Sequence, residues 1–325
     1  MPGFRQGIYR STMIRRLARV LDANPHPLVA CEIAPNHIAA ARWRRGTYSL
    51  DDYAVAPFPP EALRPSAVES NLIDAAAITT AMESVLSKVG ARGQTIALMV
   101  PDAVIRVFVL HFDVFPRSSS EAIPMLRWRL KKSVPFESEE TLISYMRQTP
   151  RDEGVDIVTA LARLRIIREY ESLAESLGLQ AGVLMSSTLA TLPLLNDQGP
   201  SMLARISGRM LTTAIAREGI LCGYRTTELP AELVILQPRA LLDEIFPVAA
   251  YYQDAWSEGL QAVQLSGFGT RMREFKDAIE SELPNCKVSG LISSALQDGR
   301  ISADMNSLAE DELDTMLGWS MNRGA

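Results

Sequence analysis

Short apolar runs at strand spacing alternate with longer stretches at helical spacing along the first half of the chain. The runs predict strands at residues 28–33, 38–43, 49–55, 95–100, 104–112, 142–147, 155–164 and 183–185. The longer stretches predict helices at residues 75–89, 168–177 and 188–195, and Gly90 and Gly178 end the first two. Short turns join the first three strands, which indicates a hairpin-rich sheet at the start of this half.

A second set of strands and helices follows a linker and is arranged like the first. Residues 196–200 (NDQGP) combine turn-forming types, and we place the main domain boundary there. Strands predicted at 202–206, 210–216 and 220–225 again form a hairpin-rich opening. Residues 231–258 are largely helical, with Pro238 and Pro247 as interruptions. They are followed by a strand at 262–265, a helix at 272–283 and a polar C-terminal region that ends in a helix at 310–321.

The segment from residue 120 to residue 145 is the most clearly marked unit of the chain. Ser118, Ser119 and Ser120 offer N-caps, and we expect the regular helix to begin within a residue or two of Pro124, which lacks an N–H group. Pro135 should end this helix before an acidic turn and the next strand. Helical spacing places one apolar stripe on Ala122, Ile123, Leu126, Leu130 and Val134. It places off that stripe Arg127, Lys131, Lys132, Met125 and Trp128.

Composition narrows the class of protein. With 325 residues, 47% hydrophobic and 22% charged, the chain has the make-up of a soluble globular protein large enough for two domains. A net charge of -5 gives no reason to expect a nucleic-acid partner, and no apolar run is long enough to span a membrane. The few cysteines and histidines are widely separated, which indicates a reducing cytoplasm and no metal site: Cys31, Cys222, Cys286, His26, His37 and His111.

Residues 1–27 are rich in arginine and form a basic leader. A helix over residues 13–21 would carry apolar side chains on one side and Arg15, Arg16 and Arg19 on the other. Such a short basic amphipathic helix could bring residues 1–22 into peripheral contact with an anionic membrane surface. The competing interpretation is a frayed leader or a helix docked on its own domain.

Four motifs in order together resemble one family. They are Trp128 with Val134-Pro135-Phe136, Glu140 and Tyr145; residues 155–163 (VDIVTALAR); Tyr170 with Leu177-Gly178-Leu179; and Leu265-Ser266-Gly267 with Gly269. From about residue 28 to the end, the chain resembles the type IV pilus assembly proteins of the PilM family, whose nearest relative is FtsA. The resemblance implies an α/β, actin-like (ribonuclease H-like) two-domain duplication, with domains at 28–196 and 197–325. It also implies an FtsA-type inserted α+β subdomain at about 104–165.

The nucleotide loops of that family are altered here. Its first phosphate turn reads roughly D-x-G-S-S-S-x-K, and the matching positions include Glu32, Ala34, Asn36 and Ala39, while Pro35 lacks an N–H group. The second turn should carry an aspartate, but the matching residues are Arg205, Ser207 and Gly208. The adenosine loop retains Gly267 and Gly269, with Phe268 where the family has a glycine.

Changes in all three loops argue against binding of ATP with magnesium, because two carboxylate positions that would help to hold the metal are lost. We therefore expect no cofactor, no catalytic residue and no metal site. Arg205 could still meet a phosphate directly, so an actin-like ATPase that binds and slowly hydrolyses ATP remains the alternative. Signatures of other enzyme classes, such as Gly-x-Ser-x-Gly or a P-loop, are absent.

The resemblance implies a cytoplasmic adaptor on the inner membrane. Such a protein binds the cytoplasmic N-terminal peptide of a PilN-like membrane protein, in a groove between the inserted subdomain and the first domain, and links the pilus motor ATPase to the assembly platform. Within this groove we expect Met125, Trp128 and Phe136 to contact the peptide; the alternative is that Trp128 and Phe136 pack between subdomains. The equivalent component of a type II secretion platform is a close variant of this function.

Overall fold

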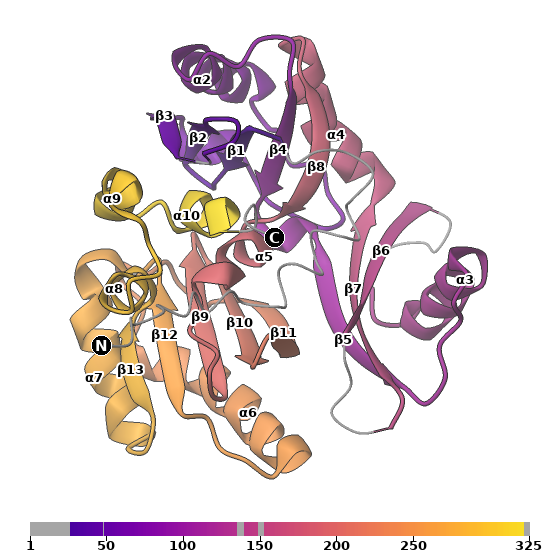
Figure 1. Cartoon of the computed structure of the whole chain (residues 1–325), viewed down its shortest axis with the longest axis vertical. Helices are drawn as coiled ribbons and strands as arrows, with labels where there is room; N and C mark the ends of the chain where they lie inside the picture. The colour runs from indigo at the N-terminus through magenta and orange to yellow at the C-terminus, as the bar shows by residue number, and fades with distance from the viewer. Residues whose placement is uncertain (1–26, 48, 135–139, 149–152, 322–325) are drawn as a thin grey trace, which may run out of the picture.

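The computed structural model describes residues 27–47, 49–134, 140–148 and 153–321. The predictions made for the leader, including its membrane contact, and for Pro135 and Phe136 lie outside these residues. Within them the chain forms two five-stranded sheets and one three-stranded sheet, each with its own helices (Figure 1).

The first five-stranded sheet has the order β3-β2-β1-β4-β8. An antiparallel meander is followed by two parallel strands: β1 (Val29–Ile33), β2 (His37–Trp43), β3 (Leu50–Pro57), β4 (Thr95–Val100) and β8 (Gln180–Ser186). The strands β1 and β4 are buried almost throughout, as their unbroken apolar sequences predict. Its helical elements are η1 (Pro60–Ala62), α2 (Ala75–Lys88), η2 (Asp102–Val104), α4 (Leu164–Ser176), α5 (Ser187–Thr191) and η4 (Leu192–Leu194).

The second sheet repeats the first in its order and strand directions. Its order is β11-β10-β9-β12-β13. The strands are β9 (Ser201–Ser207), β10 (Met210–Arg217), β11 (Ile220–Glu228), β12 (Ala262–Ser266) and β13 (Lys287–Gly290). Its helical elements are α6 (Pro238–Trp256), η5 (Gly269–Arg271), α7 (Met272–Glu282) and α8 (Leu291–Gln297). The chain is therefore an internal duplication of one α/β unit.

Two prolines lie inside helices that they were predicted to start or interrupt. The helix α3 (Ser119–Leu130) begins after the N-cap Ser118, several residues before Pro124, and its last residue is Leu130. Pro124 is exposed, so water can bind the Ser120 carbonyl that loses its helical donor. Likewise α6 continues through Pro247, while Pro238 occupies the favourable first turn. Among the helices of the described residues, none is long and apolar enough to cross a membrane.

The inserted unit between β4 and β8 is a three-stranded sheet covered by α3. Its order is β5-β7-β6, with β5 (Arg106–Phe112), β6 (Thr141–Gln148) and β7 (Val155–Arg163). Ala122 and Leu126 of α3 form a small core with Phe115 and Ile157. The buried Gln148 side chain exchanges two hydrogen bonds with the backbone of Leu221 in β11, at 2.8 and 2.9 Å. The inserted sheet is thereby fixed to the second half.

The C-terminal region returns to the first half of the molecule. After η6 (Ala303–Met305) and α9 (Asn306–Glu310), the helix α10 (Asp314–Met321) packs on α5 (Figure 1). A Cβ atom on Gly318 would lie 2.2 Å from the Ala190 carbonyl oxygen, so the approach requires glycine. Trp319 is only 1% exposed. The helix predicted at 310–321 is thus the shorter α10, and it belongs to the core rather than to a polar tail.

Candidate functional site

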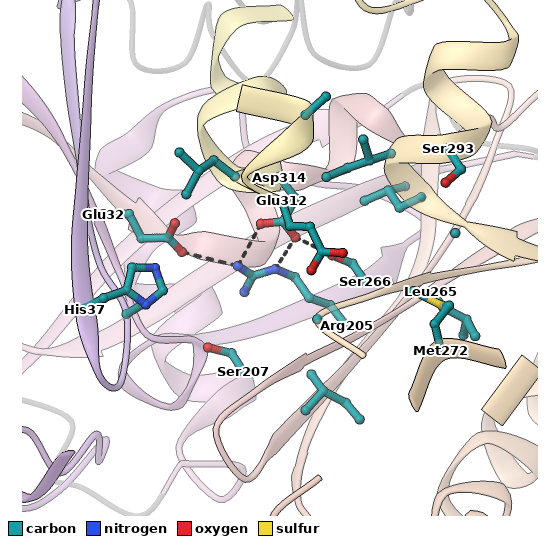
Figure 2. A pocket seen from close by; sticks show the side chains of 18 of the residues that line it. Glu32, His37, Arg205, Ser207, Leu265, Ser266, Met272, Ser293, Glu312 and Asp314 are labelled. Atoms are coloured by element: carbon teal, nitrogen blue, oxygen red, sulfur yellow. Dashed lines mark hydrogen bonds and ion pairs between the residues drawn. The ribbon is translucent and has the colours of Figure 1, made fainter. Parts of the chain in front are cut away.

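A cavity of about 330 Å³ opens between the two halves. The β1–β2 and β9–β10 hairpin turns, the end of β12, the start of α8 and the segment before α10 supply its walls. Its apolar side is formed by Leu265, Met272 and Leu291, and its polar side by Glu32, His37, Arg205, Ser207, Glu312 and Asp314 (Figure 2). The three loops that resemble nucleotide loops in the sequence therefore lie next to one another around this cavity.

Arg205 is the centre of the polar side. This side chain comes from β9 and is only 6% exposed. Its guanidinium donates two hydrogen bonds to Asp314, at 2.8 and 3.1 Å, and one to Glu32 at 3.2 Å (Figure 2). The remaining nitrogen, Nη1, lies 3.5 Å from Asp102 Oδ2. One cation from the second half thus meets Glu32 and Asp102 from the first half and Asp314 from the helix that packs on it.

Hydroxyl and amide groups donate further hydrogen bonds to these carboxylates. The Thr315 hydroxyl donates to Glu32 at 2.9 Å, and Ser266 donates to Asp314 at 2.5 Å. Asp102 accepts the amide and hydroxyl of Thr188, at 3.0 and 2.6 Å, and the hydroxyl of Tyr224 at 3.3 Å. The group is a connected network in which buried charges are paired, the condition under which they are tolerated in a protein interior.

The network shifts the pKa of Arg205, Asp314 and Tyr224. Burial by itself lowers the pKa of Arg205, but the charges of Asp314 and Glu32 outweigh it and raise that pKa above its ordinary value. Burial by itself raises the pKa of Asp314, but the charge and hydrogen bonds of Arg205 hold it below its ordinary value. Burial, together with the charge of Asp102, raises the pKa of Tyr224 well above its usual range.

The two hairpin turns that resemble phosphate loops touch each other. Gly208 has a φ of 59°, and a Cβ atom there would lie 3.3 Å from Pro35 Cγ. Pro35 therefore fills the space in front of the second turn and provides no N–H group. A phosphate loop instead leaves that space open for the anion and aims several backbone N–H groups at it.

The glycine retained in the third loop has a structural reason. Gly267 has a φ of 78°, and a Cβ atom there would lie 2.0 Å from the Ile206 carbonyl oxygen, so β12 can leave the sheet beside β9 only through glycine. Phe268 is fully buried against Phe275, with ring centroids 5.3 Å apart. Seven of the ten loop residues singled out in the sequence line the cavity, whereas Ala39, Phe268 and Gly269 do not.

Actin-like folds commonly hold a nucleotide with magnesium, and the residues present here do not fit that complex. Magnesium needs carboxylate and water oxygens around it, yet Arg205 stands between the carboxylates that could supply them. Among the described residues no group of acidic, histidine or cysteine side chains has a metal-binding arrangement. Three carboxylates engage the Arg205 guanidinium, which disfavours the direct contact with a phosphate that the sequence left open.

Several partners of Arg205 were not found from the sequence. Asp314 and Thr315 lie about a hundred residues beyond it, in a region predicted to be polar. Asp102 carried the one usable signal, because it follows the buried strand β4, and the carboxyl ends of parallel strands are where ligands of α/β proteins gather.

Two of the residues predicted for a peptide groove lie on α3. Trp128 is 78% exposed and so does not pack between subdomains. Met125 is half-buried against the core that Ala122 and Leu126 form under α3. The roles of these two residues in peptide binding remain predictions.

Comparison with known proteins rests on solved structures, since no protein-family model and no curated protein matches the chain. A structure described as the PilM-PilN type IV pilus biogenesis complex aligns over 92% of this chain and 98% of that chain, with a TM-score of 0.71 and 15% identity. The chain has the actin-like fold. This confirms the predicted two-domain duplication and its inserted subdomain; at such identity the likeness establishes the fold alone.

Two further solved structures are less similar to the chain. One is a protein with an actin-like ATPase fold and unknown function from Bacteroides thetaiotaomicron, with 9% identity, 87% and 95% coverage of the two chains, and a TM-score of 0.48. The other is the cytoplasmic domain of EpsL, an inner membrane component of the type II secretion system of Vibrio cholerae. Its values are 10% identity, 73% and 80% coverage and a TM-score of 0.47.

Proposed function

We propose that this chain is a non-catalytic adaptor of PilM type, which binds the cytoplasmic N-terminal peptide of a PilN-like membrane protein at the inner membrane. The likeness to a PilM-PilN complex over nearly the whole of both chains supports this proposal. Contact with the pilus motor ATPase is a further part of the same role. The chain would act as a rigid connector between membrane and cytoplasmic components.

The Arg205 network carries the non-catalytic part of the proposal. Arg205 takes the place of the cation that a nucleotide would bring, and it joins the two halves without any ligand. Carboxylates of Glu32, Glu312 and Asp314 line the cavity together with this one buried cation. A triphosphate would therefore meet net negative charge and no set of N–H donors. We infer that the halves are held together permanently rather than by a nucleotide cycle.

The peptide would bind where the inserted sheet meets the first half. Met146 of β6 enters the main core, whereas Ile143 and Tyr145 point to the α3 side. Strand side chains alternate, so Leu142, which is 42% exposed, lies on the face of Met146 and away from α3. Arg163 and Arg165 both donate to the Val68 carbonyl, at 2.9 and 3.0 Å, and so fix the inserted sheet to the first half at this place.

An exposed leucine on the edge strand β6 suits the recognition of an extended apolar peptide. The roles predicted for Met125, Trp128 and Phe136 would place the peptide on α3 instead. Substitutions at Leu142 and at a control position distinguish between these two binding sites. Leu142→Glu puts a charge at the junction of the inserted sheet and the first half. Leu296→Glu is its matched control, because Leu296 is 41% exposed but lies on α8 beside the cavity.

The experiment is a titration of a fluorescent peptide with the full chain, read by anisotropy. The peptide is a synthetic copy of the cytoplasmic N-terminus of a PilN-like membrane protein. We expect saturable binding that does not change when ATP and magnesium are added, a loss of at least about tenfold in affinity for Leu142→Glu, and no change for Leu296→Glu. Binding that requires ATP with magnesium would contradict the adaptor, and unchanged binding by Leu142→Glu would contradict the location.

A further inference from the structure

The outward face of α3 combines one exposed tryptophan with several cations. Trp128 lies on the opposite side of the helix from Leu126 and Leu130, which are buried. Lys131 and Lys132 come directly after Leu130, the last residue of the helix, and Arg129 lies one residue beyond Trp128. All three cations are exposed. We call Trp128, Arg129, Lys131 and Lys132 the α3 face.

This face is basic in an otherwise acidic protein. Residues 117–134 contain five arginines and lysines and a single carboxylate, Glu121, while the whole chain has a net charge of -5. Arg129, Lys131 and Lys132 form no ion pair with a carboxylate of the described residues. The positive charge of the face is therefore not neutralised within that part of the chain.

The position of α3 leaves the face accessible. Figure 1 shows α3 at the outer margin of the molecule, beyond β6 and far from α7 and α8. Its inner side packs on the three-stranded sheet, and Arg127 donates to the Thr141 carbonyl at 3.3 Å, which holds the helix to β6. The opposite side carries the exposed side chains of Trp128 and Arg129.

We propose that the α3 face binds the surface of a bilayer that contains anionic lipids. Tryptophan prefers the headgroup level of a membrane, where its ring is half in an apolar medium, and clustered lysine and arginine side chains bind anionic headgroups. A side chain that is 78% exposed stands clear of its neighbours, which suits insertion into an interface better than the wall of a peptide groove. The inference needs no nucleotide and does not depend on the peptide partner.

The fluorescence of Trp128 reports this contact directly. Of the four tryptophans, Trp43 and Trp319 are 1% exposed and Trp256 is half-buried. Trp128 therefore dominates any change in emission that a contact at the protein surface causes. The full chain is titrated with vesicles of phosphatidylglycerol and phosphatidylcholine, and with phosphatidylcholine alone, at low ionic strength. We expect a blue shift with the anionic vesicles only, and its loss in Trp128→Phe.

Charge reversal tests the cations separately. Lys131→Glu with Lys132→Glu should weaken vesicle binding by about thirtyfold or more, at roughly fivefold for each cation removed. The matched control is Arg239→Glu with Arg273→Glu, which makes the same charge change at positions 73% and 93% exposed in the second half, and it should bind within about threefold of the native chain.

Three results would overturn the proposal. In the first, the chain sediments with anionic vesicles but Trp128→Phe shows the same spectral shift, so that another segment makes the contact. In the second, both charge-reversed pairs weaken binding equally. In the third, the peptide of the adaptor assay shifts the Trp128 emission while vesicles do not, which would make the face a peptide site. Arg15→Glu with Arg16→Glu should retain the Trp128 shift, because the leader is a separate sequence.

Discussion

The guanidinium of Arg205 forms two hydrogen bonds with the carboxylate of Asp314, at 2.8 and 3.1 Å. Arg205 belongs to β9 of the second half, whereas Asp314 opens the helix that packs on α5 of the first half. A bidentate pair of this kind has fixed geometry and is stronger than two neutral hydrogen bonds. It therefore sets the relative position of the halves beside the cavity that opens between them.

Replacing Arg205 by methionine should strongly destabilise the chain. The substitution keeps an apolar stem but leaves Glu32, Asp102 and Asp314 buried without their cation, and removal of one partner of a buried ion pair costs about 3–5 kcal/mol. Urea unfolding followed by circular dichroism measures this loss. Arg209→Met, at a side chain 49% exposed in the adjacent turn, is the control and should change stability by less than about 1 kcal/mol. Equal losses in the two variants would contradict the assignment.

Acid should weaken the chain in part through Asp314. Its pKa is lower in the folded protein than in the unfolded chain, so the stabilisation is present above the unfolded value of about 3.9 and is lost as the pH falls through the folded value. Asp314→Asn cannot titrate, and its free energy of unfolding should fall less steeply than that of the native chain below about pH 4. Parallel curves for the two proteins between neutral and acid pH would rule out this role.

Two neighbouring glycines should differ in their tolerance of alanine. Gly267 and Gly269 both have positive φ, which costs alanine about 1–2 kcal/mol in either place. Only at Gly267 would the new Cβ overlap the Ile206 carbonyl, and we expect a further loss of about 1–3 kcal/mol there. Thermal unfolding of the two variants measures the difference. A Gly269→Ala variant as unstable as Gly267→Ala would show that the backbone contact is unimportant.

Two tryptophans should respond oppositely to truncation. Trp128→Ala removes a side chain that is 78% exposed, so stability should change by less than about 0.5 kcal/mol. Trp319→Ala opens a cavity in the core beneath α10 and should cost about 3–5 kcal/mol. Chemical unfolding under one set of conditions compares them, and a large loss at Trp128 would mean that this ring has a packing role.

The regular elements were predictable because local patterns determine them. Unbroken apolar runs identified the buried strands β1 and β4, and Gly90 and Gly178 marked turns beyond helices. The missed elements β13, α8 and α9 are four, seven and five residues long, too short for a periodic signal. Pro124 and Pro247 misled the prediction because exposed carbonyls one turn earlier can bind water, so a helix can continue through proline.

The site was predictable only as a set of loops. Family motifs brought Glu32, Arg205 and Gly267 to one place, and the structure agrees. Asp314 and Thr315 reach Arg205 only because of the position at which α10 packs. Tertiary packing through Gly318 determines that position, and no local sequence pattern reveals it. The substitution of aspartate by Arg205 was visible in the sequence, but its consequence required the three carboxylates around it.

Calorimetric titration of the full chain with ATP and magnesium tests the central claim most directly. If Arg205 takes the place of a nucleotide-borne cation and Pro35 closes the phosphate path, we expect no saturable heat up to millimolar nucleotide, with the chain shown to be folded in the same sample. Micromolar binding of ATP with magnesium, abolished by Ser207→Trp in the wall of the cavity while the fold is retained, would contradict the account.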